Sequence, residues 1–431
     1  MLYLLQKTFD RIVRHGNLEV IDPSGERSRF GDGSGAAVRL RIKDRVTALK
    51  LIADPDLYFG EAYADGTISI EQGTLMDVLR LFSENLNRFQ QDPGSAPWGL
   101  KYPYIMRKAL RRLIQYNSLG RAKANVAHHY DLSGTLYDLF LDRDRQYSCA
   151  YFEHDDSSLD EAQMAKKRHL AAKLQLAPRR VGPGQSARRM KILDIGSGWG
   201  GMALYLAEVC GADVVGVTLS REQYKLSVAR AERRGLSDHV EFRLMDYRDL
   251  DESFDRILSI GMFEHVGLGY YGEFFHKLQR LLKPDGIACL HSIARADGPG
   301  VTSAWINKYI FPGGYIPALS EVLPALEQAG LLLTDIEVLR LHYARTLQQW
   351  RRRFADHRAQ VKALYDERFC RIWEFYLAGS ECAFRYQNLN NFQIQLTRDQ
   401  AVLPLTREYM ISEEQRLREI DSRLPRLKSV S

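Results

Sequence analysis

The stretch Lys191-Ile-Leu-Asp-Ile-Gly-Ser-Gly-Trp-Gly-Gly201 decides the fold of this chain. A short apolar run leads to Asp194 and Ile195, and glycines follow at positions 196, 198, 200 and 201. This order predicts a strand that turns tightly into a helix. Glycine there lets the backbone approach a ligand, and the helix start offers free N–H groups. The pattern is typical of nucleotide-binding folds, but alone it does not distinguish one cofactor from another.

Strand-like and helical segments alternate after this turn. We expect strands at 191–195, 213–219, 240–245, 254–260 and 287–293, and helices at 202–209, 221–234 and 271–282. We expect Pro284 and Gly286 to end the last of these helices. Such alternation predicts an α/β fold with a Rossmann-like parallel sheet and helices on both faces. Ligands of such sheets bind at the carboxyl ends of the strands.

The length of 431 residues exceeds one ordinary core and predicts two domains. Residues 1–115 combine strand-like runs such as Ala37–Ile42 with helical segments, which predicts a small N-terminal α+β domain. Residues 116–431 form the expected catalytic domain, in which Ser158-Leu-Asp-Glu161 is a capping box that begins a helix. Hydrophobic content is 45% and charged content 26%, as in soluble globular proteins. The five scattered cysteines lack metal spacing, so we predict a reducing cytoplasm and no metal site.

The end of the second predicted strand distinguishes two cofactors. An NAD site usually has an acid about 20 residues past the glycines, whereas this strand ends in Thr218. S-adenosylmethionine (SAM) fits better, with Thr218 and Gln223 replacing the acid that many SAM enzymes use for the ribose. Asp246 and Tyr247 end the third strand, where they are placed to meet an adenine. Asp246 is equally compatible with a plain turn residue.

The net charge of +6 is clustered, which raises the question of an anionic partner. One cluster contains Arg107, Lys108, Arg111, Arg112, Arg121 and Lys123, and the other Arg351, Arg352 and Arg353. Solvated helix faces, anionic lipid and nucleic acid all fit such charges. The fourth strand leads to Gly261-Met-Phe-Glu-His-Val-Gly267, without the Pro-Pro-aromatic motif of DNA amino-methyltransferases. A Pro-Cys nucleophile is also missing, so nucleic acid is disfavoured as a partner.

Several further motifs resemble one family, the cyclopropane-fatty-acyl-phospholipid synthases and the related mycolic acid cyclopropane synthases. The motifs are Ala127-His-His-Tyr-Asp-Leu132, Gln146-Tyr-Ser-Cys-Ala-Tyr-Phe152, Leu193–Gly201, Val215–Ser220, Asp255–Gly267, Leu290-His-Ser-Ile293, Trp305–Gly314, His342–Leu347 and Phe375–Ala378. They run in order from about 120 to 390. Gly60-Glu-Ala-Tyr-Ala-Asp-Gly66 also resembles the accessory domain of the bacterial members that act on lipids.

The resemblance implies a reaction, its cofactors and its partner. A methyl group would pass from SAM to the cis double bond of an unsaturated phospholipid acyl chain, giving a carbocation. Loss of a proton from the added methyl, with bound bicarbonate as base, would close a cyclopropane ring. One alternative is C-methylation without ring closure. A lipid-binding protein that only retains SAM, and a methyltransferase with an oxygen or nitrogen nucleophile, are more distant alternatives.

The resemblance also implies site residues. The expected bicarbonate holders are Cys149, Glu264, His291, Ile293 (through its backbone) and Tyr343. The expected SAM-binding residues are Tyr147, Ser148, Asp194, Gly196, Gly198, Thr218, Leu219, Gln223, Asp246 and Tyr247. Taken singly, Cys149 also fits buried filler, Glu264 a backbone acceptor, His291 a satisfied core histidine and Tyr343 an interface aromatic. His128 and His129 are expected to be structural, because neighbouring side chains on a regular element point apart.

Two positions depart from the family pattern. Ser380 stands where many members carry cysteine, which argues against a required thiol there, and Ser197 stands in the glycine turn where cysteine is common. The segment 295–317, rich in glycine and aromatic residues, is expected to cover the acyl pocket. We expect the N-terminal domain and the basic clusters to hold the protein peripherally at the inner membrane surface, and homodimerisation is a further expectation.

Overall fold

The computed structural model describes residues 2–91, 98–114, 133–176 and 188–423, and in it Lys191–Ile195 is the predicted strand, β5. The motif Ala127–Leu132, the side chains of Arg121, Lys123, His128 and His129, and residues 177–187 before β5 lie outside the described residues. The described chain divides into two compact units. Each is described by itself below.

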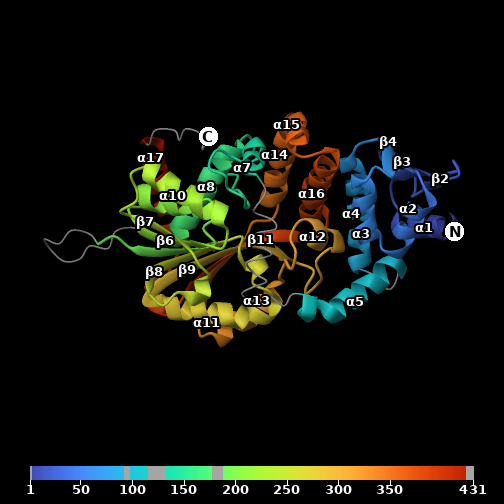
Figure 1. Cartoon of the computed structure of the whole chain (residues 1–431). Coiled ribbons are helices and arrows are strands. Elements are labelled where there is room, and N and C mark those ends of the chain that lie inside the picture. Colours follow the sequence, from blue (N-terminus) through green and yellow to red (C-terminus); the bar gives the residue numbers. More distant parts are fainter. Residues whose placement is uncertain (1, 92–97, 115–132, 177–187, 424–431) are drawn as a thin grey trace. The chain divides into compact units, whose positions relative to one another are not determined.

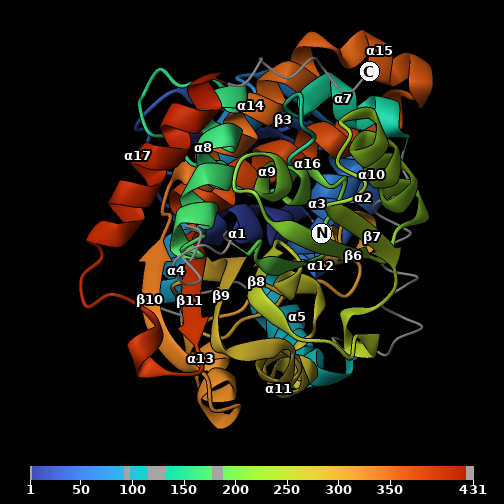
Figure 2. The same cartoon turned by 90° about the vertical axis from the view of Figure 1, so that its left-hand side faces the viewer.

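The second unit comprises Gln115–Ala294, Pro317–His342 and Asn390–Ser431 and is built on the predicted parallel sheet. Within the described residues its strands have the order β10-β11-β9-β8-β5-β6-β7, and all of them except β5 are labelled in Figure 2. β5 pairs in parallel with both β6 and β8, β6 with β7, and β8 with β9, whereas β10 and β11 are antiparallel. From β5 the strands that follow in sequence lie on one side of it, and from β8 onward they lie on the other, so the strand order reverses between β5 and β8. Ligands of open α/β sheets bind beside the carboxyl ends at such a point.

The strands of this sheet are β5, β6 (Asp213–Thr218), β7 (Val240–Leu244), β8 (Phe254–Ile260), β9 (Leu282–Arg295), β10 (Leu332–Val338) and β11 (Leu389–Thr397). The helices of the unit are α7 (Gly134–Phe140), α8 (Leu159–Lys173), α9 (Gly201–Glu208), α10 (Arg221–Arg233), α11 (Tyr271–Leu281), α13 (Leu319–Gln328) and α17 (Glu408–Arg423). Short 3-10 turns lie at Tyr247–Asp249, Phe263–His265, Leu268–Tyr270 and Gln400–Val402. α8, α9 and α10 cover one face of the sheet and α11 and α13 the other (Figures 1 and 2).

Local signals explain most of these boundaries. The Ser158 side chain and the Glu161 side chain each accept from the other residue's backbone N–H, so the predicted capping box is present. Gly235 follows α10 with a φ of +66°, as the predicted helix end requires. One prediction was wrong: the last strand begins at Leu282, before Pro284, and not at Ile287. A register shift opposite Phe254 and Arg256 forms a bulge, and a bulge tolerates proline in a strand.

The first unit comprises Met1–Ile114, Arg295–Ile316 and Tyr343–Leu389. Its sheet has the order β2-β1-β3-β4, with β1 parallel to β3 and the other pairs antiparallel. The strands are β1 (Asn17–Ile21), β2 (Arg27–Phe30), β3 (Ala37–Ile42) and β4 (Ile68–Gln72). The helices are α1 (Leu2–Ile12), α2 (Arg45–Ala53), α3 (Pro55–Ala64), α4 (Leu75–Gln91), α5 (Trp98–Ile114), α12 (Ala304–Tyr309), α14 (His342–Asp356), α15 (Arg358–Leu364) and α16 (Glu367–Tyr386).

This unit combines segments from separate parts of the chain, whereas the sequence predicted two domains that follow each other along the chain. Glu61 of α3 accepts hydrogen bonds from Lys308 and Tyr309, at 2.6 and 2.9 Å, and Asp56 accepts one from the backbone of Ala304. The segment expected to cover an acyl pocket therefore packs on N-terminal helices, and its role as a cover stays a prediction. Among the described residues, no helix combines the length and the apolar character needed to cross a bilayer.

Candidate functional site

The glycine turn after β5 needs glycine for two reasons. Gly196 has a φ of +80°, and a Cβ on it would come within 2.9 Å of the Cβ of Met262. The backbone N–H groups of Gly196 and Ser197 both donate to the carbonyl of Val217, at 3.0 Å. The turn is thereby fixed against β6. It leaves a surface without side chains at the switch point of the sheet. Gly198, with a φ of +55°, continues it.

Asp194 lies at the end of β5 and is only 2% exposed. Among the described residues, its Oδ2 has no hydrogen-bond partner. Burial raises the pKa of this carboxyl to about 7, although the charge of Lys166 opposes the rise. A buried acceptor without a partner costs free energy unless a ligand or water completes it. The predicted role of Asp194 in SAM binding stays a prediction.

The end of β6 presents a small hydrogen-bonded group. The Thr218 hydroxyl donates to Gln223 Oε1 at 2.8 Å, and both side chains are buried. Ser220 caps α10 by accepting from the Gln223 backbone, and this cap fixes where the Gln223 side chain begins. Because Oε1 is engaged, the group that Gln223 offers a ligand is its Nε2 donor. Leu219, half-buried, lies between the two polar residues.

The end of β7 carries an ion pair that the sequence did not reveal. Asp246 is 3% exposed, and Arg248 holds both of its carboxylate oxygens at 2.9 Å. Asp246 also accepts from the Arg248 backbone, so the plain turn role that the sequence left open is present. Tyr247 stands edge-on to Phe274, with ring centroids 5.5 Å apart, and burial raises the pKa of its phenol. Any adenine contact of Asp246 must therefore share the carboxylate with Arg248.

The segment that precedes α8 places Tyr147, Ser148 and Cys149. Tyr147 packs against Tyr137 and Phe140, with ring centroids 5.6 and 6.2 Å apart. A Cβ on Gly261, just after β8, would lie 3.8 Å from Ser148 Cβ, so Ser148 lies beside the carboxyl end of that strand. Cys149 is fully buried, and its thiol donates to the carbonyl of Ala150 at 3.4 Å. Buried filler therefore remains a sufficient role for this cysteine.

Glu264 and Ile293 meet where β8 and β9 end. The backbone N–H of Ile293 donates to Glu264 Oε1 at 2.6 Å, while Glu264 Oε2 is buried and, in the described chain, has no partner. Burial raises the pKa of Glu264 to about 7, which the Ile293 amide opposes. Glu264 is a backbone acceptor, one alternative that the sequence left open, but only through one of its oxygens.

His291 lies two residues before Ile293, on the same face of β9. It is fully buried, and its backbone carbonyl accepts from Gly261 at 2.9 Å. Gln393 Nε2 lies 3.1 Å from its Nδ1, so with this amide orientation Nδ1 accepts and Nε2 carries the proton. Nε2 is buried without a partner among the described residues. Burial holds the pKa of His291 well below 6.5, so the ring is neutral and offers one unused donor.

Tyr343 differs from the other predicted catalytic residues because it belongs to the first unit. It lies in the first turn of α14 and is 8% exposed. Its ring packs against Phe384 and Trp350, with centroids 4.7 and 5.9 Å apart. Its part in the site stays a prediction.

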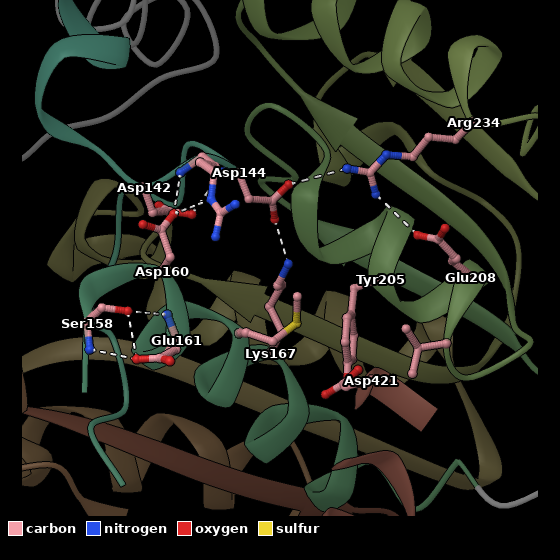
Figure 3. A pocket seen from close by; sticks show the side chains of 13 residues that line it. Asp142, Asp144, Ser158, Asp160, Glu161, Lys167, Tyr205, Glu208, Arg234 and Asp421 are labelled. Atoms are coloured by element: carbon pink, nitrogen blue, oxygen red, sulfur yellow. Dashed lines mark hydrogen bonds and ion pairs between the residues drawn. The ribbon is translucent and has the colours of Figure 1, made fainter. Parts of the chain in front are cut away.

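A charged pocket of about 370 Å³ lies beside α8 (Figure 3). Its residues hold the N-terminal side of the segment that carries Tyr147, Ser148 and Cys149. Asp144 receives Lys167 at 2.7 Å and also pairs with Arg230 and Arg234. Arg230 donates to the carbonyl of Trp199 in the glycine turn, at 2.5 Å. Buried Asp142 accepts from the Gln146 backbone at 2.8 Å. These contacts tie the glycine turn to the start of Gln146–Cys149, although none of the pocket's lining residues was a predicted site residue.

The donors and acceptors just described fit SAM. Asp194 Oδ2 is an acceptor that needs a donor. Gln223 and Thr218 lie at the next strand end, with Asp246 and Tyr247 at the one beyond. These predicted groups lie at the carboxyl ends of three adjacent strands, the edge at which ligands of such sheets bind.

Comparisons with known proteins agree with this geometry. A family model described as mycolic acid cyclopropane synthetase matches residues 117–394, and a domain of unknown function (DUF7884) matches residues 4–93. The chain is 40% identical over 394 residues to a probable fatty acid methyltransferase of Pseudomonas putida, covering 89% of this chain and 94% of that protein. It is 35% identical over 378 residues to the cyclopropane-fatty-acyl-phospholipid synthase of Escherichia coli K12, covering 86% and 91%.

A solved structure is also similar. The mycolic acid cyclopropane synthase CmaA1 complexed with SAH and CTAB aligns with a TM-score of 0.59 at 33% identity, covering 65% of this chain and 99% of that one. The mixed α/β fold with a parallel-dominated sheet is thus the fold of SAM-dependent methyltransferases such as the cyclopropane synthases. The chain belongs to the mycolic acid cyclopropane synthetase family of SAM-dependent methyltransferases.

Proposed function

We propose that this protein adds the methyl carbon of SAM to the cis double bond of an unsaturated phospholipid acyl chain and closes a cyclopropane ring. When bound, SAM supplies an electrophilic methyl carbon, and bicarbonate supplies a base for the proton that ring closure releases. The chain's own residues have two tasks. They hold the donor in line with the double bond, and they manage one proton away from water.

One observation carries this proposal: two buried polar atoms without described partners belong to neighbouring strands, with Glu264 just after β8 and His291 in β9 beside the last residue of β8. His291 Nε2 carries a proton that it can donate, and Glu264 Oε2 is an open acceptor or, when protonated, a donor. A bicarbonate ion has carboxylate oxygens that accept and a hydroxyl that donates, so its chemistry complements both atoms. A pKa of about 7 also lets Glu264 exchange a proton near neutral pH, which general acid–base chemistry requires.

The experiment is a reaction with vesicles. The protein is incubated with SAM and vesicles of dioleoyl phosphatidylglycerol, and the fatty acids are analysed by mass before and after mild hydrogenation. A gain of one CH₂ that resists hydrogenation supports the ring. Acyl chains of unchanged mass would overturn the proposal, provided that the protein binds S-adenosylhomocysteine in the same buffer.

A second candidate product is favoured by one comparison. The Pseudomonas putida relative, 40% identical, is named as a probable fatty acid methyltransferase, without mention of a ring. An open methylene product would show the same gain of CH₂ but would take up two hydrogens on hydrogenation. The same assay therefore separates the two outcomes.

We further propose that α5 brings the protein to the membrane surface. Tyr102, Ile105, Met106 and Leu110 of this helix are exposed by 61, 52, 51 and 43%. Apolar groups together with basic ones on one helix are typical of interfacial segments. The basic clusters contribute less to membrane attraction than the number of their charges suggests, because Arg107 pairs with Asp54 and Asp56 and Arg351 with Glu381.

Homodimerisation remains a separate prediction, which light scattering on the purified protein tests.

A further inference from the structure

α8 carries three buried lysines, and their partners differ. Lys167 pairs with Asp144 at 2.7 Å and Lys173 with Glu337 at 2.5 Å. Lys166 is fully buried as well, yet among the described residues no carboxylate oxygen lies within 4.0 Å of its ammonium. A buried ammonium without a direct ion pair is unfavourable, and a ligand that brings the opposite charge would stabilise it.

The two hydrogen bonds of Lys166 lead to the predicted SAM site. Its Nζ donates to Gln146 Oε1 at 2.7 Å and to Ser148 Oγ at 2.8 Å. Gln163, one turn earlier on α8, donates to the Ser148 carbonyl at 3.0 Å. α8 thus holds both the side chain and the backbone of Ser148. Both hydrogen-bond acceptors of Lys166 are neutral, and the carboxylates that influence its charge, Asp142 and Asp144, act on it without a direct ion pair.

This contact also fixes the direction of the Ser148 hydroxyl. An ammonium has only donors, so Ser148 Oγ must accept from Lys166. The hydroxyl proton is then free to point at an acceptor elsewhere. Gln146 is oriented in the same way, because its Oε1 accepts from Lys166 while its Nε2 donates to Asp144 at 3.2 Å. Beside Ser148, the structure therefore combines a positive charge with a hydroxyl donor, which together suit an anion.

We propose that Lys166 is a positioning residue whose buried charge, acting through Ser148, holds a carboxylate-type anion in the methyl-transfer site. This inference rests on the proposed function, which supplies two sources for such an anion: the carboxylate of the methyl donor and bicarbonate. Burial lowers the pKa of Lys166 to about 8, which leaves the ammonium mostly protonated at neutral pH.

The test compares Lys166→Met with the matched variant Lys167→Met. Both remove one buried ammonium from adjacent positions of α8, but only Lys167 has a carboxylate partner. Isothermal titration measures binding of S-adenosylhomocysteine and of 5′-methylthioadenosine, which lacks the carboxylate. In Lys166→Met we expect the Kd of S-adenosylhomocysteine to rise on the order of 10- to 100-fold, as for lost hydrogen bonds to a charged group. The Kd of 5′-methylthioadenosine should stay within about twofold.

Bicarbonate forms the second arm. If bicarbonate is the anion, Lys166→Met leaves both Kd values unchanged but raises the bicarbonate concentration needed for half-maximal turnover, by on the order of tenfold. The melting temperature gives an independent readout. Lys166→Met should lower it less than Lys167→Met, because Lys166 forms no direct ion pair, whereas Lys167→Met strips Asp144 of a partner.

Other outcomes would overturn the proposal. Equal weakening of both nucleosides would indicate general distortion, and unchanged binding together with an unchanged bicarbonate response would show that Lys166 holds no anion. Lys166→Gln keeps a donor toward Ser148 without the charge, so failure of both variants to fold would make the role structural. Binding of nucleosides needs no lipid, so a wild-type protein that binds them but forms no ring product refutes the proposed product and not the role of Lys166.

Discussion

Substituting Glu264 by glutamine should raise stability and abolish turnover together. The carboxyl is 8% exposed, and burial raises its pKa from 4.5 to about 7. Between these two values the unfolded chain ionises and the folded protein does not, so wild-type stability falls as pH rises through this window. At about 1.4 kcal/mol per pKa unit, the loss is about 3 kcal/mol by pH 8. Glutamine is neutral throughout and keeps an oxygen for the Ile293 amide.

The assay is chemical denaturation without ligand at several pH values from 4.5 to 8. We expect the difference in unfolding free energy between Glu264→Gln and wild type to grow by about 3 kcal/mol across this range. Taking the difference cancels other groups, such as Asp194, whose pKa burial also raises to about 7. Glu232→Gln on the exposed side of α10 is the control, because it removes the same charge without burial.

Kinetics complete this prediction. Turnover of Glu264→Gln should fall by about 100-fold or more if the carboxyl relays the proton, while the Kd of S-adenosylhomocysteine changes little. A pH profile of unfolding parallel to that of wild type would refute the burial argument. Unchanged turnover would remove Glu264 from the proton path.

Three further predictions concern other parts of the molecule. Gly196→Ala should lower the free energy of unfolding by about 1–2 kcal/mol, more than Gly198→Ala, because a Cβ on Gly198 meets nothing within 4 Å. It should also weaken the binding of S-adenosylhomocysteine more. Thermal denaturation and titration measure these two effects. Below pH 6.5, unfolding of the wild type takes up a proton at His291, so its free energy of unfolding falls as the pH drops. In His291→Asn this fall should be less steep. A pH dependence of unfolding unchanged from wild type at pH 5–7 would contradict the burial of His291 as a neutral ring. Ile105→Asp on α5 should reduce co-sedimentation with anionic vesicles, whereas Val46→Asp, 61% exposed on α2, should not.

Strands β5 to β8 and most of β9 could be predicted from the sequence, because most of them are apolar runs that stop at a polar or glycine residue. Thr218 and Asp246 stand at such stops, and the structure places both at the sheet's ligand edge. The antiparallel strands β10 and β11 were not predicted, since polar residues interrupt both of them. The division into units could not be predicted in this way. Glu61 and Lys308 are separated by 247 positions, and a pairing over that distance leaves no local pattern.

Lys166 was missed for a different reason. Ala162 and Leu170 lie on one apolar stripe of α8, and Lys166 lies between them at a spacing of four on each side. A lysine on a stripe that faces the core is itself a signal of a buried charge. α8 is buried on nearly every side, however, and helical periodicity reports only one face. The ion pair of Arg248 with Asp246 was not predicted, because it depends on a 3-10 turn that the sequence does not mark.

Asp194, Glu264 and His291 each keep a buried polar atom without a described partner, Lys166 has no direct ion pair, and all four belong to the second unit. Asp194 lies one residue before the end of β5, Glu264 follows β8, His291 lies in β9 beside the last residue of β8, and Lys166 holds Ser148 beside Gly261. Each costs stability in the ligand-free fold, since an unsatisfied buried group forfeits its hydration. Elsewhere on α8 the same residue type forms a direct ion pair, as for Lys167 and Lys173, whereas Lys166 does not. A ligand that completes these groups stabilises the fold, which predicts that S-adenosylhomocysteine raises the melting temperature of wild type more than that of Lys166→Met.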